Sequence, residues 1–287
     1  MKFATWNLNS VRARHDRLVA WLARSDVDVL LIQETKVPDD KFPAAAVEDL
    51  GYQVAHHGFS QWNGVGILSR VGIENVRTGF PGMPTFGEPP QLEARAIGAT
   101  CGGVDLWSLY VPNGRALADP HYDYKLRWLA ALTELTRSEL AAEPTRQLAL
   151  CGDFNIAPTD DDVWNPALFQ GSTHVSAPER AAFTALLDAG LTDVVRPLLP
   201  GPGVYTYWDY QQLRFARREG MRIDFALATP ALARRVTGAV IDRQERKGKG
   251  ASDHAPVIVE LDGTPPDDLD FDVSSSDTTD DRPEFAR

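Results

Sequence analysis

Polar side chains able to bind a metal ion or move a proton lie next to several short apolar runs of this sequence. Those that follow a run are Asn7 (after 3–6), Glu34 (after 29–32), Tyr110 (after 106–109), and Asp153 and Asn155 (after 148–150); those that precede one are Asp224 (before 225–227) and Asp253 and His254 (before 256–261). Each run is short enough to form a buried strand. Because antiparallel strands end and begin at the same edge of a sheet, we expect these side chains to meet at one edge.

Such a set of carboxylates, carboxamides, one tyrosine and one histidine favours oxygen-ligated metal chemistry. Mg²⁺ binds one or two carboxylates and leaves positions open for water and phosphate, and Mn²⁺ is its expected substitute. Hydrolysis of a phosphodiester needs an activated water, neutralised charge on the phosphate and help for the leaving oxygen. Zinc usually recruits several His or Cys, and only His254 stands in a suggestive context. A carboxylate after a strand is also a common solvent-facing residue, so the pattern alone leaves that alternative open.

The elements that must position these residues alternate between strand-like and helix-like segments. Runs 3–6, 29–32, 64–68 and 148–150 predict strands, and runs 94–101 and 104–111 flank Gly102-Gly103, a signal of a tight antiparallel hairpin. Helical patterns cover 11–24, 119–142 and 178–189, the last preceded by the capping-box pair Ser176 and Glu179. No repeat or break in composition precedes Gly263. We therefore expect one α/β catalytic domain over residues 1–262.

Charge is distributed unevenly along the 287 residues. The net charge of −11, taken alone, disfavours nucleic acid as a partner. Residues 264–287, however, carry eight acidic and two basic side chains, whereas residues 211–250 carry ten basic and four acidic ones. We predict that residues 263–287 form an acidic, disordered tail, because they contain too few large apolar residues to offset the entropy of ordering. The tail either aids solubility or acts as a DNA mimic, an autoinhibitory segment or a partner-binding segment.

The composition is that of a globular, cytoplasmic protein. Hydrophobic residues make up 43% of the chain, yet no apolar run approaches the ~20 residues needed to span a membrane. The first residues read as a strand and not as a signal peptide. Cys101 and Cys151 are too few for a disulfide framework or a four-cysteine zinc site, which points to a reducing compartment. Glycine-rich loops of nucleotide-triphosphate motors and Rossmann dehydrogenases do not occur in the sequence.

Six short strings occur in an order that is far more specific than any one of them. They are Trp6-Asn7-Leu8-Asn9-Ser10-Val11-Arg12-Ala13, Gln33-Glu34-Thr35-Lys36, Tyr110-Val111-Pro112-Asn113-Gly114, Gly152-Asp153-Phe154-Asn155-Ile156-Ala157-Pro158-Thr159-Asp160, Gly220-Met221-Arg222-Ile223-Asp224 and Ser252-Asp253-His254-Ala255-Pro256. On these strings the chain, over residues 1–261, resembles the exonuclease III branch of the endonuclease/exonuclease/phosphatase superfamily, which includes abasic-site endonucleases. The resemblance implies a four-layered α/β sandwich, with two mostly antiparallel sheets face to face, helices outside and the active site at one edge.

The resemblance also implies which residues hold the metal. Glu34 is expected to be the principal Mg²⁺ ligand, with Asn7 nearby. Asp253 is expected to contribute directly or through a water molecule. Whether the site takes one metal ion or two is left open by the sequence.

Further roles implied by the resemblance concern the reaction itself. Asp153 is expected to accept the proton of the attacking water or hold the water in line, and Asn155 to orient it. His254, held by Asp224, is expected to hydrogen-bond the scissile phosphate. Tyr110 is expected to donate to the phosphate or to assist the departing 3′ oxygen. The division of labour among Asp153, Tyr110 and the metal stays open.

Segments 206–210 and 221–223 resemble those that shape the family's pocket for a sugar without a base. The substrate-binding candidates are Asn113, Arg115, Tyr207, Trp208, Met221, Arg222 and Ile223. The aromatic and apolar members either line the pocket or pack in the core. Basic residues of segment 211–250 are candidates for phosphate contacts that position DNA without reading its sequence. The remaining histidines match no motif and are expected to be structural or surface residues; they are His15, His56, His57, His121 and His174.

We therefore expect a monomeric, Mg²⁺-dependent DNA repair nuclease. It would cleave double-stranded DNA 5′ to abasic sites, degrade 3′ ends as a 3′-to-5′ exonuclease and clean blocked 3′ ends. One alternative is a phosphatase of the same superfamily that acts on a small phosphoester. The other is a DNA-binding protein without catalytic activity, although every expected catalytic residue is present.

Overall fold

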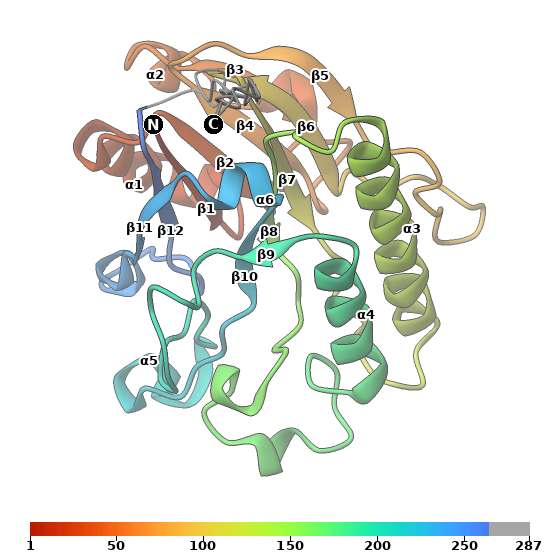
Figure 1. Cartoon of the computed structure of the whole chain (residues 1–287). Helices are drawn as coiled ribbons and strands as arrows, with labels where there is room; N and C mark the ends of the chain where they lie inside the picture. The colour runs from red at the N-terminus through yellow and green to blue at the C-terminus, as the bar shows by residue number, and fades with distance from the viewer. Residues whose placement is uncertain (264–287) are drawn as a thin grey trace, which may run out of the picture.

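Two six-stranded sheets lie face to face in the computed structural model, which describes residues 1–263 (Figure 1). The first sheet has the order β11-β12-β1-β2-β4-β3 and consists of β1 (Lys2–Asn7), β2 (Val29–Gln33), β3 (Gln53–His57), β4 (Val65–Ser69), β11 (Val236–Ile241) and β12 (Val257–Leu261). The second has the order β5-β6-β7-β8-β10-β9 and consists of β5 (Glu74–Thr78), β6 (Ala96–Cys101), β7 (Val104–Tyr110), β8 (Leu148–Asp153), β9 (Thr192–Asp193) and β10 (Asp224–Ala228). Pairs β1/β2 and β7/β8 are parallel and the other neighbours antiparallel, which confirms the mostly antiparallel sandwich.

Helices cover the outer faces of both sheets, as Figure 1 shows for α3 and α4. They are α1 (Val11–Ser25), α2 (Ala45–Glu48), α3 (Pro120–Ala142), α4 (Ala177–Asp188), α5 (Arg214–Arg217) and α6 (Pro230–Ala233), with 3₁₀ turns at Asp39–Lys41, Asp160–Asp162, Pro166–Phe169, Gln211–Leu213 and Arg243–Arg246. The three helices predicted from the sequence are confirmed to within one or two residues at each end. Among residues 1–263, no helix is both long and apolar enough to cross a membrane.

Alternating side chains along the strands divide the apolar residues into three cores. In β2, Val29 and Leu31 face the other sheet, whereas Leu30 and Ile32 face α1. The second sheet behaves in the same way, since Leu106 faces inward and Trp107 faces α3. This period of two is the one expected of strands buried on both faces. The layering is therefore helix, sheet, sheet, helix, as the resemblance implies.

The register of the strands brings the predicted polar residues to one edge of the sandwich. In the second sheet, Asp153 at the end of β8 pairs with Tyr110 of β7 on one side and with Asp224 of β10 on the other. In the first sheet, Asn7 at the end of β1 pairs with Gln33 at the end of β2. A parallel pair and an antiparallel neighbour thus deliver side chains from distant parts of the chain to one place.

Two glycine features support this arrangement. The predicted hairpin at Gly102-Gly103 joins β6 to β7, and both residues have positive φ, at 55° and 78°. Gly152 has φ of 144°, and a Cβ at that position would lie 1.9 Å from the carbonyl oxygen of Leu109. Only glycine therefore allows β8 to approach β7 closely just before Asp153. Apart from its first residue, Gly263, the predicted acidic tail lies outside the described residues.

Replacing Gly152 by alanine should lower the free energy of unfolding by at least about 3 kcal/mol, because the new methyl group meets backbone and not a flexible side chain. Gly72→Ala is the matched control, since Gly72 also has positive φ but open space around it, and should cost about 1 kcal/mol. Urea unfolding followed by tryptophan fluorescence measures both. Equal losses in the two variants would contradict the close approach of β8 to β7.

Candidate active site

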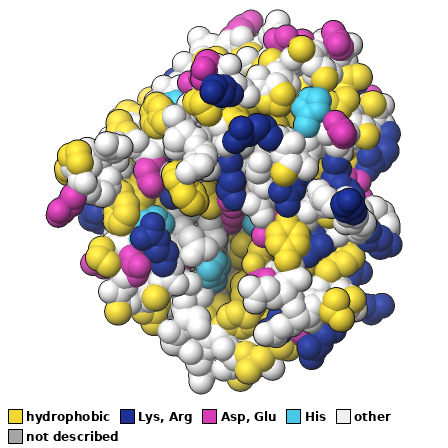
Figure 2. Space-filling view, turned by 180° about the vertical axis from the view of Figure 1, so that it is seen from behind, with side chains coloured by type: hydrophobic (Ala, Val, Ile, Leu, Met, Phe, Trp, Pro, Cys, Tyr) yellow, Lys and Arg dark blue, Asp and Glu magenta, His cyan; other side chains and the backbone are white. Residues whose placement is uncertain are grey.

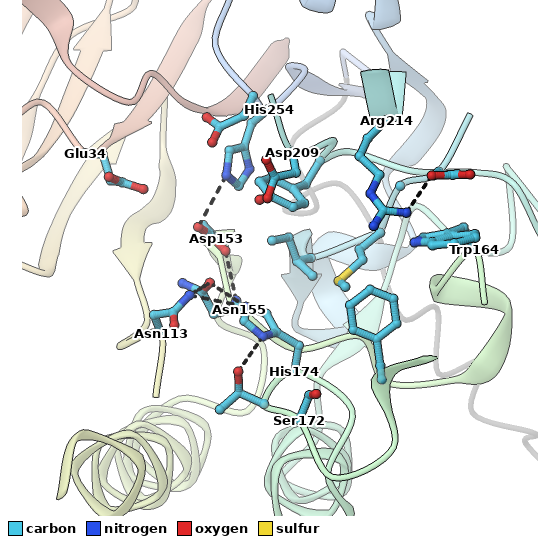
Figure 3. Close-up of a pocket in the computed structure, with 18 of the residues that line it drawn as sticks. Glu34, Asn113, Asp153, Asn155, Trp164, Ser172, His174, Asp209, Arg214 and His254 are labelled. Atoms are coloured by element: carbon cyan, nitrogen blue, oxygen red, sulfur yellow. Dashed lines mark hydrogen bonds and ion pairs between the residues drawn. The ribbon is translucent and has the colours of Figure 1, made fainter. Parts of the chain in front are cut away.

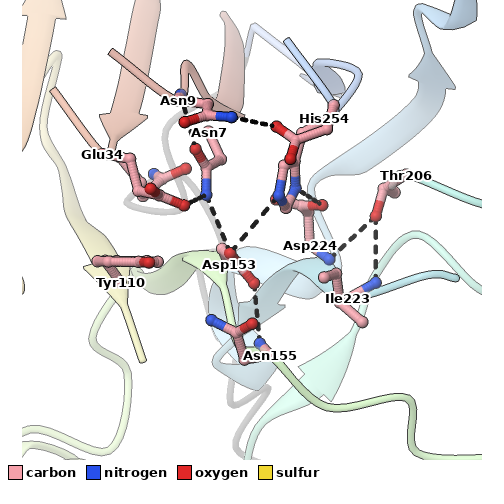
Figure 4. Close-up of polar contacts among 12 residues, drawn as sticks. Asn7, Asn9, Glu34, Tyr110, Asp153, Asn155, Thr206, Ile223, Asp224 and His254 are labelled. Carbon is pink, nitrogen blue, oxygen red and sulfur yellow. Dashed lines mark hydrogen bonds and ion pairs between the residues drawn. The ribbon is translucent and has the colours of Figure 1, made fainter. Parts of the chain in front are cut away.

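Polar side chains from both sheets meet in one buried cluster at this edge (Figure 4). The Asn7 carboxamide donates to Glu34 Oε1 at 2.8 Å and to Asp153 Oδ2 at 3.0 Å, which links the first sheet to the second. His254, from the loop before β12, has its Nε2 3.8 Å from the same Asp153 oxygen. Segments near both ends and the middle of the chain thus form a single site.

Glu34 is held at the end of β2 by an unusual local backbone. Glu34 and Lys36 both have positive φ, at 51° and 56°, a conformation that costs a non-glycine residue free energy. Buried Thr35 lies between them; its Oγ1 is 2.7 Å from His56 Nε2, and its N–H donates to the carbonyl of Gly64. Burial raises the pKa of Glu34. Lys36, whose Nζ lies 2.8 Å from Glu34 Oε2, and the hydrogen bond from Asn7 lower it by more, so the pKa lies below its usual value. Glu34 is therefore an ionised carboxylate suited to a cation.

Asp153, His254 and Asp224 form a buried chain of ionisable groups. His254 Nδ1 lies 2.8 Å from Asp224 Oδ2, which leaves Nε2 to face Asp153. Burial raises the pKa of Asp153 to about 7, although the nearby His254 lowers it. Burial lowers the pKa of His254, but the carboxylates of Asp224 and Asp153 outweigh it and raise the pKa to about 10. At neutral pH the imidazole is a cation that can donate to a phosphate oxygen, and Asp153 is poised to exchange a proton.

Glu34, Asp153 and His254 offer ligand atoms within 4.8 Å of one another. Two carboxylates beside the Asn7 carboxamide form an oxygen-rich set, which suits a hard divalent cation. His254 is less available as a ligand, because Asp224 holds its other ring nitrogen and its pKa is raised. Asp253 lies beside this set, and its Oδ1 accepts from Asn9 Nδ2 at 3.0 Å. The residues present therefore fit a metal ion bound mainly by oxygen.

Tyr110 completes the cluster at the end of β7. Burial raises its pKa well above the usual value, and the carboxylates of Glu34 and Asp153 add to the effect. The Arg95 guanidinium lies 4.8 Å from the centre of the Tyr110 ring, and its Nη1 donates to the Tyr110 carbonyl. Tyr110 thus keeps its phenolic proton and acts as a hydrogen-bond donor. Arg95 carries no motif and was not predicted from the sequence.

A pocket of about 410 Å³ opens beside the cluster (Figure 3). In this view Glu34 lies on one side and Arg214 and Trp164 on the other, with Asp153 between them. Many of the predicted residues line it, namely Glu34, Tyr110, Asn113, Asp153, Asn155, Tyr207, Met221, Ile223, Asp253 and His254. The pocket therefore joins the polar cluster to an apolar wall.

Three predicted substrate residues do not line this pocket. Arg222 is buried and ion-paired, with its Nε 2.6 Å from Asp162 and its Nη1 2.5 Å from Asp193. Trp208 is 1% exposed and packs in a small separate apolar cluster with Tyr205 and Ala255. Arg115 lies on the surface, 4.0 Å from Asp119. The alternation of side chains along 221–223 explains Arg222, because Met221 and Ile223 face the pocket while the residue between them faces away.

Several lining residues escaped prediction because they lie in segments without a motif. Trp164 and Phe169 extend the apolar wall. Glu219 lines it too, and its Oε2 lies 2.5 Å from Nη1 of Arg214, one of the basic residues that the sequence offered for phosphate contacts. His174, expected to be structural or superficial, lines the pocket, and its Nε2 lies 3.1 Å from Asn155 Oδ1. Burial, with the nearby Lys125 ammonium, lowers the pKa of His174 to about 3 and keeps the ring neutral.

A fully buried ion pair supports this side of the pocket. Lys125 Nζ of α3 lies 2.5 Å from Glu179 Oε1 at the start of α4, and both side chains are 0% exposed. Lys125 also donates to the carbonyls of Asn155 (2.6 Å) and Asn113 (3.3 Å). Glu179 accepts the backbone N–H of His174 at 2.9 Å. The pair therefore fixes the backbone at Asn113, Asn155 and His174, whose side chains line the pocket.

The chain is similar to known proteins over nearly the whole of its described length. The model of the endonuclease/exonuclease/phosphatase family matches residues 4–254. Exodeoxyribonuclease III of Haemophilus influenzae is 32% identical over 274 residues, which cover 91% of this chain and all of that protein.

Two solved structures are similar in fold as well as sequence. A 3′ phosphatase from Neisseria bound to a product DNA hairpin is 40% identical, with a TM-score of 0.86, covering 91% of this chain and 99% of that one. An AP endonuclease from Archaeoglobus fulgidus is 35% identical, with a TM-score of 0.84 and the same coverage. These relatives span nearly the whole described chain.

Replacing Lys125 by methionine should lower the free energy of unfolding by about 3 to 5 kcal/mol, because it leaves the Glu179 carboxylate buried without its partner. The double variant Lys125→Met/Glu179→Gln should be more stable than Lys125→Met, since it removes the orphaned charge and keeps an acceptor for His174. Arg137→Met, at an exposed ion pair, is the control and should cost less than about 1 kcal/mol. Urea unfolding measures all three, and a Lys125→Met variant as stable as the control would contradict the role of the pair.

Proposed function

The chain belongs to the exonuclease III and abasic-site endonuclease branch of the endonuclease/exonuclease/phosphatase family, and on that basis we propose that it is a metal-dependent DNA repair nuclease. It hydrolyses the phosphodiester 5′ to an abasic site and removes nucleotides or blocking groups from 3′ ends. The observation that carries the proposal is the cluster in which Asn7 joins Glu34 to Asp153, opposite His254. We propose Mg²⁺ as the metal, with Mn²⁺ as a substitute.

Each side chain of the cluster has a proposed part in the hydrolysis. Glu34, with Asn7 and Asp253 beside it, holds the metal, which when bound supplies positive charge to the phosphate and polarises its oxygens. Asp153 takes the proton from the attacking water, for which a pKa of about 7 suits it. His254, kept protonated by Asp224, donates from Nε2 to a phosphate oxygen. Tyr110 donates its phenolic proton toward the phosphate or the departing 3′ oxygen.

Asn155 has a less direct part than its sequence context implies. Its backbone N–H donates to Asp153 Oδ1 at 2.9 Å, while its side-chain oxygen accepts from Asn113 Nδ2 at 3.0 Å. These contacts fix the orientation of the Asp153 carboxylate. We therefore propose that Asn155 aligns the Asp153 carboxylate, in addition to any contact that it makes to the attacking water.

The apolar wall beside the cluster fits a sugar without a base. Trp164, Phe169, Met221 and Ile223 present apolar surface, and Tyr207 lies over the His254 ring with 5.0 Å between the ring centres. A deoxyribose turned out of the duplex would place its 5′ phosphate at Asp153 and His254 and its apolar face against this wall. The AP endonuclease among the relatives supports this substrate.

Removal of a 3′ phosphate is the second proposed activity, supported by the 40% identical 3′ phosphatase from Neisseria. The same groups serve both reactions, because in each a water attacks a phosphate that accepts a hydrogen bond from His254, while Asp153 takes the proton of the water. Glu34 would hold the metal in both. We further propose that the catalytic domain spans residues 1–262 and acts as a monomer on double-stranded DNA.

Replacing Glu34 by glutamine or Asp153 by asparagine should lower cleavage of an abasic duplex at least about 100-fold, because the first weakens the metal site and the second removes the base. A 5′-labelled duplex with one abasic analogue, with the product ends resolved on a gel, gives both rate and cleavage position. Glu134→Gln, an exposed residue of α3, is the control and should retain wild-type activity. Full activity of either site variant, with unchanged thermal stability, would disprove the assignment.

Removing divalent metal with a chelator should abolish cleavage, and Mg²⁺ or Mn²⁺ should restore it. The Glu34→Gln variant should also bind Mn²⁺ at least tenfold more weakly, at roughly 1.4 kcal/mol per tenfold, in a calorimetric titration that does not depend on activity. Unchanged Mn²⁺ affinity in this variant would show that Glu34 is not a ligand. Activity that persists in excess chelator would contradict metal dependence altogether.

A further inference from the structure

A second groove lies directly beside the catalytic pocket. It has a volume of about 290 Å³ and is lined by Asp209, Tyr210, Leu213, Arg214, Phe215, Ala216, Arg246, Lys247 and Gly248. Asp209 and Arg214 line both this groove and the catalytic pocket, so the two are separated by a single wall. We call it the Arg246 groove.

Arg246 is a buried cation without a buried anion. It is 9% exposed, and its Nε and Nη2 donate to the carbonyl oxygen of Trp208 at 3.3 and 3.0 Å. Within residues 1–263, no carboxylate lies within 4.0 Å of its side-chain nitrogens. Arginine is seldom buried unless it is paired, because a desolvated charge is costly. Burial accordingly lowers the pKa of Arg246.

The neighbouring arginines show that this lack of an acid is local. Arg17 and Arg24 both pair with Glu245, the residue next to Arg246. Arg243 pairs with no acid among the described residues; its guanidinium lies over the rings of Trp208 and Phe215, 5.5 and 4.8 Å from their centres. Within the described residues Arg243 and Lys247 have no carboxylate within 4.0 Å either. The groove thus carries Arg246 and Lys247 without an ion pair among residues 1–263, beside one acidic lining residue, Asp209.

The shape of the site suits a phosphate that is part of a nucleic acid strand. A guanidinium can bind phosphate oxygens through two adjacent N–H groups. Because Nε and Nη2 of Arg246 each donate to Trp208, the edge formed by Nη1 and the second Nη2 proton is the one left for a phosphate. The group is fixed between the Tyr210 and Phe215 rings, at 4.9 and 5.2 Å. Tyr210 and Leu213 are 48% and 74% exposed and offer apolar surface for the attached sugar or base. On the face shown in Figure 2, Lys and Arg side chains lie around a hollow in which acidic side chains are visible.

Trp208 connects this groove to the reaction. Its carbonyl accepts from Arg246, and its N–H donates to the carbonyl of Asp253 at 2.9 Å. One buried residue therefore fixes both the Arg246 guanidinium and the loop that carries Asp253 and His254. A phosphate held by Arg246 would be in fixed register with the phosphate under attack.

We propose that the Arg246 groove binds a backbone phosphate of the DNA, in a nucleotide flanking the one whose phosphodiester is cleaved. This inference rests on the proposed DNA nuclease function. Among the basic residues of segment 211–250 that the sequence offers for phosphate contacts, it assigns a defined site to Arg246. Arg246 acts on binding and register and not on the bond that breaks.

The test compares Arg246→Met with Arg137→Met, which removes the same charge from an exposed site on α3. Binding of a fluorescent duplex with an uncleavable abasic analogue is followed by anisotropy in chelator, so that it does not depend on catalysis. Arg246→Met should bind about tenfold more weakly, the loss of one charge-assisted contact. Its log–log dependence of affinity on salt should be shallower by about one unit. The control should match wild type in both.

Kinetics provide a readout that misfolding would not give. Arg246→Met should raise KM for the duplex with kcat nearly unchanged, while Arg246→Lys, which keeps the charge without the fork, should be intermediate. Lys247→Met, which removes a charge with one exposed hydrogen bond to Gln244, should also lower the salt slope without altering thermal stability. Equal affinity and equal salt slopes for wild type, Arg246→Met and Lys247→Met would overturn the proposal. Failure of the wild-type protein to cleave a cleavable abasic duplex would instead count against the proposed function. The anisotropy measurement of binding does not depend on cleavage, so the two outcomes can be told apart.

Discussion

The Asn7 carboxamide joins the two sheets at the point where the chemistry must occur. Its Nδ2 donates to Glu34 at the end of the first sheet's β2 and to Asp153 at the end of the second sheet's β8. These hydrogen bonds require the two sheets to be aligned at one edge. Further back, buried Gln33 donates to Ser108 of β7 at 2.9 Å and so fixes the same alignment within the core. A shift of either sheet along the other would separate the Glu34 carboxylate from the Asp153 carboxylate.

Burial then gives the aligned groups their different protonation states. Glu34 is paired with Lys36 and stays ionised, whereas Asp153 is desolvated among other acids and has a pKa of about 7. His254 becomes a cation because Asp224 holds its other nitrogen. Their surroundings thus give these three groups different protonation states, which suit the proposed parts of metal ligand, base and hydrogen-bond donor. The close approach of β8 to β7 at Gly152 belongs to the same arrangement, because it precedes Asp153 directly.

Charge in this protein is informative only by location. The net value of −11 conceals a pocket wall held by the buried pair Lys125–Glu179, a cluster of acids that suits a cation, and a groove in which Arg246 has no acid partner among the described residues. Where the fold needs rigidity, buried charges are paired. In the groove proposed to bind a phosphate, Arg246 has no such ion pair among residues 1–263. Whether the protein suits a nucleic acid is therefore indicated by which of its charges are paired, and not by its net charge.

The sequence by itself determined the family, the strand-end residues and most of the secondary structure. Strings such as Gln33-Glu34-Thr35-Lys36 are contiguous, and apolar periodicity and the Gly102-Gly103 turn depend on neighbours in the chain. It misplaced Arg222, which faces Asp162 and Asp193, and it missed His174 and Trp164, whose segments carry no motif. These assignments depend on which face of a segment meets which distant segment. Only the tertiary structure decided them, because the burial, pairing and pKa of a side chain are set by atoms far away in the sequence.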